Sequence, residues 1–375
     1  PSQYRWNLGI THTLPWDIEL SADLILSRVK DEVLWQDIRL QQTGTAPDGR
    51  PIYTPLDEGR SSSVQDLLLT NTNEGEGLVF TVDASKTWRT GAGRFDAYLA
   101  YGYQDIKDVN PGTSSTASSN WDNVAVADPN DPELETSNYE IEHMFKGAFT
   151  WRKAFFGDYE SSISLVGERR AGRPYSYTFG SGSPVWGDPR QASRQRHLFY
   201  VPDGDVLFEV PCTQADVDGG VPGCADLFSF TSATPAAAQF ASDVEAYIEQ
   251  QGLEKYRGRI VPRNSHRSPW LSVLDLRFTQ ELPVFRRMRG VLTLDIENFA
   301  NLLDKDWGQL RQVSFPYFTP VLDAGRIETV GCPGGAASCY VYRPRSGQTG
   351  PVKPFNTISS LPSVWRMQLG FRIEF

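Results

Sequence analysis

The side chains of this sequence that could carry out chemistry are scattered and form no catalytic motif. The histidines lie far apart, and no His-Glu-x-x-His metalloprotease motif occurs. They are His12, His143, His197 and His266. The glycine–serine segment at residues 180–183 lacks the Gly-x-Ser-x-Gly spacing of a serine hydrolase. We therefore predict that the protein is not an enzyme and uses no cofactor and no metal. We expect His143 at the outer rim of a strand and not among metal ligands.

Three acidic clusters could bind a cation, at residues 128–133, 203–205 and 216–218. Ca²⁺ prefers oxygen ligands such as carboxylates on turns. None of the clusters has the spacing of an EF-hand, so solvated acidic loops are favoured over an ion site. Bound Ca²⁺ stays an open alternative.

The four cysteines fall in two close pairs, Cys212 with Cys224 and Cys332 with Cys339. Both pairs lie in sequence rich in glycine and proline, which predicts two loop disulfides and an oxidising compartment. Four free thiols are the alternative. A zinc site is disfavoured, because the spacings are wrong and no histidine is close in sequence.

Ligand recognition would need aromatic and polar groups that converge at one end of the molecule. Six aromatic residues in the long connecting segments are candidates for this role, although packing between loops would also explain each of them. They are Trp121, Tyr139, Tyr175, Tyr177, Trp186 and Trp307. Aromatic rims suit sugar rings and peptides alike, so these residues do not name a substrate.

The elements that would position these residues are strands, because apolar and polar residues alternate with a period of two. Near the end of the chain, Leu369, Phe371 and Ile373 alternate with Gly370 and Arg372. Nine such segments are predicted, at about residues 4–14, 17–41, 77–90, 94–105, 141–152, 159–172, 272–281, 291–298 and 365–375.

The connectors between these strands alternate in length. Short turns are predicted at residues 15–17, 90–93, 156–158 and 283–289. Long loops are predicted at about residues 42–76, 108–139, 173–269 and 301–363. Outer-membrane barrels have this pattern of short periplasmic turns and long extracellular loops.

One helix is predicted inside the third long loop, at residues 236–252. Its apolar stripe consists of Phe240, Val244, Tyr247 and Ile248. Gly252 is the expected C-cap, because glycine adopts the left-handed conformation that ends many helices.

The polar face of the predicted strands carries arginine, lysine, aspartate and glutamate, which a close-packed core would not tolerate. A water-filled lumen would tolerate them, and the apolar face would then contact lipid. Six tryptophans near strand ends fit the aromatic girdles of such a barrel. They are Trp6, Trp16, Trp88, Trp151, Trp270 and Trp365. The predicted fold class is all-β, a transmembrane antiparallel β-barrel.

Composition agrees with this prediction. No run of about 18 apolar residues occurs, so no transmembrane helix is predicted. The formal net charge of −10 argues against a nucleic-acid partner, because phosphate binding rests on lysine and arginine. The mean hydropathy of −0.40 is compatible with a barrel, in which only every second strand residue faces lipid.

Four segments resemble motifs of Oar-like TonB-dependent outer-membrane receptors. They are DVNPGTSSTASSNW at 108–121, SNYEIEH at 137–143, GRPYSYTF at 172–179 and LDIENFANLLDKDW at 294–307. The terminal Phe375 is similar to the aromatic ending that the barrel assembly machinery recognises in outer-membrane proteins.

The resemblance implies a 22-stranded barrel, of which this chain would supply roughly the last nine strands. It implies that a plug domain, a TonB box and an amino-terminal domain belong upstream, and that TonB acts through that plug. The expected location is the bacterial outer membrane, with its lipid as a partner. The expected function is energised transport of an unidentified bulky substrate, in either direction.

Two other functions stay open. The barrel could be a structural or surface-anchoring protein that binds a surface partner and transports nothing. Alternatively, the chain could be a secreted all-β binding protein or enzyme. The last function requires an apolar interior between sheets, which the charged strand faces disfavour.

Overall fold

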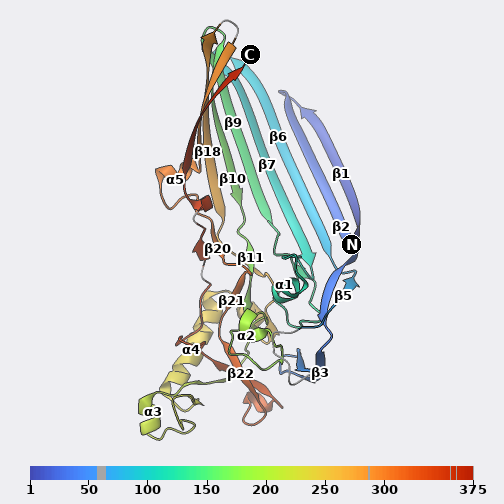
Figure 1. Cartoon of the computed structure of the whole chain (residues 1–375), viewed down its shortest axis with the longest axis vertical. Helices are drawn as coiled ribbons and strands as arrows, with labels where there is room; N and C mark the ends of the chain where they lie inside the picture. Colours follow the sequence, from blue (N-terminus) through green and yellow to red (C-terminus); the bar gives the residue numbers. More distant parts are fainter. Residues whose placement is uncertain (57–64, 286–287, 355, 360, 375) are drawn as a thin grey trace.

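The computed structural model of the chain describes residues 1–56, 65–285, 288–354, 356–359 and 361–374. The chain is mostly β, with 50% of its residues in strands and 13% in helices, which confirms the all-β prediction. Figure 1 shows a long sheet at one end of the molecule and a smaller, irregular part at the other. We call this second part the loop region, meaning the described residues within 38–56, 109–142, 171–269 and 298–365.

Nine long strands pair in chain order to form the main sheet, and every pairing is antiparallel. They are β1 (Ser2–Leu14), β2 (Ile18–Asp37), β6 (Glu76–Thr90), β7 (Gly93–Asp108), β9 (His143–Phe156), β10 (Tyr159–Arg170), β18 (Leu271–Phe285), β19 (Met288–Glu297) and β25 (Arg366–Glu374). The predicted strands are thus confirmed, with most ends shifted by a few residues. Two short strands, β5 (Leu67–Thr72) and β8 (Glu135–Thr136), extend the sheet beside β2 and β7.

The strands are joined by tight turns at the end of the sheet away from the loop region (Figure 1). Trp16 and Asp17 have positive φ angles of 67° and 57°, which reverse the chain between β1 and β2. Gly93 has a φ of 131°, and a Cβ there would lie 2.4 Å from the carbonyl oxygen of Arg152, so only glycine fits. The turn predicted at 283–289 is shorter than expected, because β18 continues to Phe285. Residues 286–287 lie outside the described part.

The strand register places apolar side chains on one continuous face of all nine strands. Leu99 in β7, for example, is opposite Ala84 of β6 and Gly147 of β9. This face is open to the surroundings, since Leu99 is 68% exposed and Leu369 is 70% exposed. Burial of this face inside the molecule would have argued against a membrane. The structure instead leaves it uncovered.

The opposite face of the sheet is polar and carries ion pairs between neighbouring strands. Asp96 of β7 accepts hydrogen bonds from Arg94, at 3.0 Å, and from Arg152 of β9, at 2.6 Å. Arg277 of β18 pairs with Asp295 of β19 at 2.5 Å. The partition into an apolar face and a charged face, predicted from the alternation, is therefore present in the structure.

The path of nine strands is open. In the described part, β1 pairs only with β2 and β25 only with β19 among the main strands, so no closed barrel is formed. The predicted assembly residue Phe375 lies outside the described residues. No helix in the described part has the length and hydrophobicity needed to cross a membrane.

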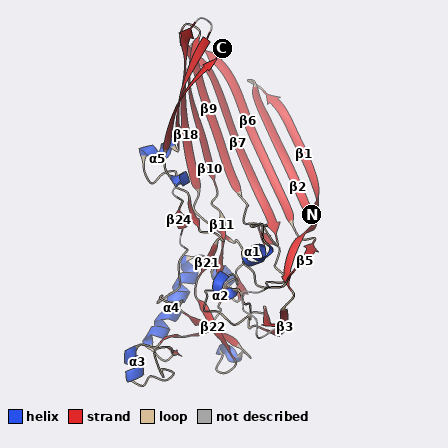
Figure 2. Cartoon of the chain, in the orientation of Figure 1, coloured by secondary structure: helices blue, strands red, loops and turns tan. Residues whose placement is uncertain are grey.

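The loop region contains all the helices of the described residues, as Figure 2 shows. They are α1 (Ala117–Asp122), α2 (Gln191–Arg194), α3 (Gln214–Asp218), α4 (Pro235–Gln250) and α5 (Phe299–Leu303), with the 3₁₀ turns η1 (Glu254–Tyr256), η2 (Pro333–Gly335) and η3 (Leu361–Ser363). The expectation of a single helix was therefore too low. Four of the five are single turns, which are too short to show a helical period in sequence.

Short strands complete the loop region. They are β3 (Leu40–Thr45), β4 (Pro51–Pro55), β11 (Pro174–Thr178), β12 (Tyr200–Val201), β13 (Leu207–Phe208), β14 (Val210–Pro211), β15 (Phe230–Thr231), β16 (Arg259–Ile260), β17 (His266–Arg267), β20 (Arg311–Val313), β21 (Phe318–Pro320), β22 (Asp323–Glu328), β23 (Cys339–Arg343) and β24 (Asn356–Ile358). The predicted strand at 17–41 is interrupted after Asp37, and β3 and β4 form a separate hairpin.

The longest helix, α4, confirms the predicted helix with small changes at its ends. It starts at Pro235, because the Thr234 side chain accepts a hydrogen bond from the Ala237 N–H and caps the first turn. It ends at Gln250, and Gly252 follows the C-cap with a φ of 66°. The predicted apolar stripe is buried, and each fully buried side chain of this kind contributes roughly 1.5–3 kcal/mol.

Candidate functional site

The loop region is held together by a hydrophobic core that three of the four long connectors build. Its central side chains are aromatic and include Phe179, Phe199, Tyr340 and Tyr342, all fully buried. A second, smaller cluster contains Leu40, Tyr53 and Trp121. Loops with only polar contacts would not hold a fixed position, so this core makes the loop region a packed unit at one end of the sheet.

Four of the six aromatic residues expected to face a ligand belong to these cores. The exposed fractions of Trp121, Tyr175, Tyr177 and Trp186 are 3%, 6%, 0% and 0%. Their burial favours the alternative role, packing between loops, over contact with a ligand. Aromatic side chains have a large apolar area, and burying that area in a core stabilises the fold.

The other two aromatic candidates are exposed and belong to different connectors, Tyr139 between β7 and β9 and Trp307 between β19 and β25. Tyr139, 53% exposed, precedes β9, and Arg173 lies over its ring at 5.8 Å. Trp307, 55% exposed, follows α5 near the start of β18. The structure therefore does not bring the six candidates together into one mouth.

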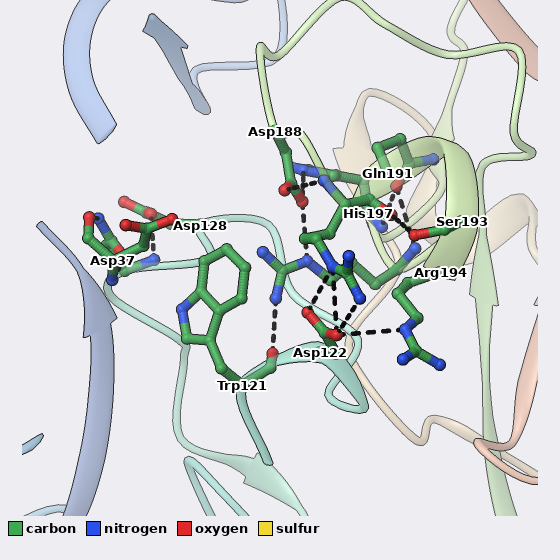
Figure 3. Close-up of polar contacts among 12 residues, drawn as sticks. Asp37, Trp121, Asp122, Asp128, Asp188, Gln191, Ser193, Arg194 and His197 are labelled. Carbon is green, nitrogen blue, oxygen red and sulfur yellow. Dashed lines mark hydrogen bonds and ion pairs between the residues drawn. The ribbon is translucent and has the colours of Figure 1, made fainter. Parts of the chain in front are cut away.

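A buried ion network lies beside the second cluster and is the most concentrated polar site of the loop region (Figure 3). The Asp188 carboxylate accepts hydrogen bonds from the Arg196 Nε, at 2.7 Å, and from the His197 Nε2, at 3.1 Å. Gln191 binds the same segment, since its Oε1 accepts from the backbone N–H groups of Arg196 and His197. All three charged or ionisable side chains have no exposed surface.

Aromatic rings cover this network on two sides. The ring of His197 stacks on Trp186 with centroids 4.4 Å apart. The Arg196 guanidinium lies 3.6 Å from the ring centroid of Trp121 and donates a hydrogen bond to the Trp121 carbonyl. Delocalised guanidinium and indole groups attract each other strongly when water is excluded. The network thus joins the connector that contains α1 to the one that contains α2.

A second, more open set of charges continues the network toward the surface. Asp122, at the end of α1, is fully buried and accepts from Arg190 at 2.6 Å and from Arg194 at 3.2 Å. Arg194 itself is partly exposed. This arrangement pairs each buried carboxylate with a guanidinium group, as a structural ion network does.

The protonation states follow from these contacts. Burial alone would raise the pKa of Asp188, but the adjacent Arg196 guanidinium and His197 hold that pKa well below its usual range. Burial lowers the pKa of His197, and Arg50 and Arg196 lower it further against the opposing effect of Asp188. His197 is therefore neutral and carries its proton on Nε2, facing the Asp188 carboxylate. Burial also lowers the pKa of His266.

We expect the loop region to lose stability as the pH falls from about 6.5 toward 5. An unfolded histidine takes up a proton near pH 6.5, whereas folded His197 and His266, with lowered pKa values, do not. The unfolded state then binds more protons, and each histidine reduces the free energy of unfolding by up to about 1.4 kcal/mol per pH unit. Denaturant midpoints followed by tryptophan fluorescence across this range measure the effect.

The variant His197→Gln should reduce that pH dependence by about one proton. A denaturation midpoint that stays constant or rises on acidification would contradict this assignment.

A third polar cluster joins the loop region to the sheet. The side chain of Arg263, buried, donates to the carboxylate and carbonyl of Asp108 at the end of β7 and to the carbonyl of Glu135. Nearby, Glu140 accepts from Arg267 and from the backbone N–H of Ile106. These contacts fix the 135–142 segment between β7 and the chain entering β18.

The motifs at 137–143, 172–179 and 294–307 therefore have structural roles in this chain. A Cβ at Gly172 would lie 1.9 Å from the carbonyl oxygen of Ser268, so this close approach of two backbones requires glycine. Asn298 adopts a φ of 51° and donates to the Gly308 carbonyl at 2.9 Å, which closes the chain around α5.

Both predicted disulfides are present, Cys212–Cys224 and Cys332–Cys339. The first encloses α3, and the second joins η2 to the start of β23. Each closes a short ring at the end of the loop region away from the sheet (Figure 1).

Removing the first disulfide with the paired change Cys212→Ser and Cys224→Ser should destabilise only its own ring, by about 3 kcal/mol, because the bond restricts the unfolded ring. Limited proteolysis should then cut between residues 212 and 224 while the sheet stays intact. The pair Cys332→Ser and Cys339→Ser, with a shorter ring, serves as the comparison and should have a smaller effect. Loss of the sheet in either variant would show that the bridges act globally.

The polar face of the sheet contains an open pocket of about 490 Å³. It is lined by Thr150, Ser164, Asp275, Arg277, Asp295 and Gln368, among others. Its lining combines these charged and polar side chains with the apolar residues Val166, Leu276 and Ile296. No group of three or more histidine, cysteine, aspartate or glutamate residues in the described part is arranged to hold a metal ion.

The residues that organise the loop region, above all Asp188, Arg196 and Arg263, were not among those predicted from the sequence. Asp188 is only eight residues from Arg196, but this spacing matches no regular element, and the other partners of Arg196 and Arg263 are far away in sequence. Trp121, for example, is 75 residues from Arg196. A cationic residue inside an otherwise polar loop gives no local sign of burial.

The geometry defines a mostly-β protein with a nine-stranded sheet path, one uncovered apolar face and a packed loop region. No protein-family model matches the chain, and a search of curated proteins found no significant match.

Proposed function

We propose that this chain is the carboxyl-terminal part of the β-barrel of an outer-membrane transport receptor of the Oar-like, TonB-dependent class. One observation carries the proposal: an uncovered apolar face continues across nine strands while the opposite face is charged. A water-soluble protein rarely exposes so large an apolar surface. In a membrane barrel, lipid contacts the apolar outer face, and water in the lumen solvates the charged inner face.

The free edges of the sheet support completion of a barrel by further strands. Hydrocarbon offers no hydrogen-bond partners, so each unpaired backbone group there costs several kcal/mol. β1 and β25 would both pair with strands from elsewhere in the receptor, giving the larger, even-numbered barrel that the resemblance implies. Phe375 would then be the residue that the barrel assembly machinery recognises.

The distribution of aromatic rings supports the same orientation. Trp88 and Phe95 stack at 5.4 Å near the turns, and Tyr101 and Phe145 meet at 4.9 Å near the loop region. Phe95 and Tyr103 are eight residues apart on β7, a separation of roughly 26 Å along a strand. That length, reduced by strand tilt, suits the apolar band of an outer-membrane barrel, about 25 Å tall.

The orientation can be tested with nitroxide labels on the full receptor in lipid vesicles. Labels at Leu369→Cys and at Gln368→Cys sit next to each other on β25 but on opposite faces. We expect the label at 369 to collide mainly with oxygen, which concentrates in lipid, and the label at 368 to collide mainly with a water-soluble nickel complex. Equal access of the nickel complex to both labels would rule out the membrane assignment.

A second function, surface anchoring without transport, is favoured by the loop region, whose own core and two disulfides suit a rigid display platform. The two functions differ in their coupling to TonB. The detergent-solubilised full receptor should be retained by immobilised TonB carboxyl-terminal domain if it is a transporter. Membrane insertion without retention would favour the anchoring function.

A further inference from the structure

A pocket of about 420 Å³ lies at the boundary between the apolar face of the sheet and the loop region. We call it the rim pocket. Its lining includes Trp270, Ser272, Asp306, Trp307, Gln309 and Arg311. It is formed where the segment after α5 folds back beside the start of β18.

The rim pocket opens on the apolar face and not on the polar one. Ser272 is in register with Arg169 and, one strand further, Phe145 of that face. The Trp270 ring lies 6.4 Å from Phe145 and stacks at 6.2 Å on His143. His143 is the first residue of β9, at the end of the strand nearest the loop region.

The rim pocket has apolar surroundings on both sides. Leu274 follows on the same face of β18, and Leu302 and Leu303 of α5 are 40% and 63% exposed. A molecule seated here would therefore have an apolar portion along the sheet and a polar portion in the pocket. This is the form of a membrane lipid.

The charged side chains in and beside the rim pocket favour a lipid with an anionic headgroup. Arg169 lies over Trp270 at 5.4 Å and beside Ser272, and it forms no ion pair with any described residue. Arg311 is exposed and donates only to the neutral Gln309 side chain within the described part. The one carboxylate of the pocket, Asp306, is paired with Lys305 at 3.2 Å. Arg311 in the lining, and Arg169 over the Trp270 wall, thus have no carboxylate partner in the described part, and guanidinium groups bind phosphate in bidentate fashion.

We propose that the rim pocket binds the phosphate-bearing headgroup of a membrane lipid, with Arg169 and Arg311 as the phosphate ligands and Trp270 and Trp307 as walls. The inference rests on the proposed membrane orientation and adds a lipid site to it. A bound lipid would brace the segment after α5 against the sheet and so link the loop region to the surrounding membrane.

The test uses the full receptor in nanodiscs that contain phosphatidylcholine with a minor share of phosphatidylglycerol. Native mass spectrometry after release counts the phosphatidylglycerol retained per protein. We expect retention by the unmodified receptor and a loss of about tenfold in the double variant Arg169→Gln/Arg311→Gln, because each removed arginine weakens the attraction to anionic lipid. The matched double variant Arg366→Gln/Arg372→Gln, on the polar face, should retain lipid normally.

The lipid site would be overturned if both double variants retained the same amount of phosphatidylglycerol, or if the receptor retained phosphatidylcholine equally well. Neither result would affect the proposal of membrane insertion. Displacement of the lipid by inorganic phosphate alone would also overturn it, because a simple anion site needs no acyl chain. If the receptor does not enter nanodiscs at all, the membrane orientation itself fails, and the lipid site fails with it.

Discussion

Replacing Leu99 by arginine is expected to cost about 2–4 kcal/mol of stability in a bilayer. Leu99 is 68% exposed on the apolar face and lies halfway along β7, between Phe95 and Tyr103. A guanidinium at this height would face hydrocarbon, where it can neither be hydrated nor reach the interface easily. The measurement is the free energy of unfolding of the full receptor in lipid vesicles, from guanidinium chloride titration.

The matched control is Tyr98→Arg, which places the same side chain one residue away on the polar face. Tyr98 faces its cross-strand neighbours Ser85 and Ala148 there, and water would solvate the new charge. We expect a change within about 0.5 kcal/mol for this control. A similar cost for both variants would mean that neither face contacts lipid, which would remove the basis of the receptor proposal.

Replacing Asp188 by alanine is expected to destabilise the loop region by about 3–5 kcal/mol. The change leaves the Arg196 guanidinium buried without its carboxylate, and the Nε2 proton of His197 loses its acceptor. The backbone bonds on either side should open with it, among them Phe179 N–H to the His197 carbonyl. Hydrogen exchange of peptides covering residues 176–200 measures this opening.

The exposed Asp218, which accepts only from Gln214 of the same helix turn, provides the control. Its change to alanine should alter exchange in residues 176–200 very little. If Asp188→Ala leaves exchange unchanged as well, the buried network does not hold the loop region together, and the aromatic core must do so alone.

The strands, the long helix and the disulfides could be predicted from sequence because each has a local signature. Alternation in β25 places Leu369 and Gln368 on opposite faces whatever the strand pairs with. The stripe of α4 repeats at helical spacing, and Cys212 and Cys224 are close enough in sequence to meet in any compact loop.

The aromatic candidates show where local reasoning failed. Tyr177 and Tyr139 look alike in sequence, as aromatic residues in polar loops, yet one is fully buried and the other is 53% exposed. The difference arises from chain segments that are distant in sequence. Arg50, for example, reaches the carbonyl of Leu198 and lies over the ring of Trp186.

The amino-acid sequence by itself therefore determined the strands, their two chemically distinct faces, the helix α4 and the pairing of the cysteines, because backbone geometry imposes periods that side chains must follow. Only the tertiary structure decided which loop aromatics are buried, how Asp188 and Arg263 are neutralised and where the rim pocket lies. Those features depend on contacts between residues far apart in sequence, such as Arg263 with Asp108, 155 positions away, and such contacts exist only once the whole chain has folded.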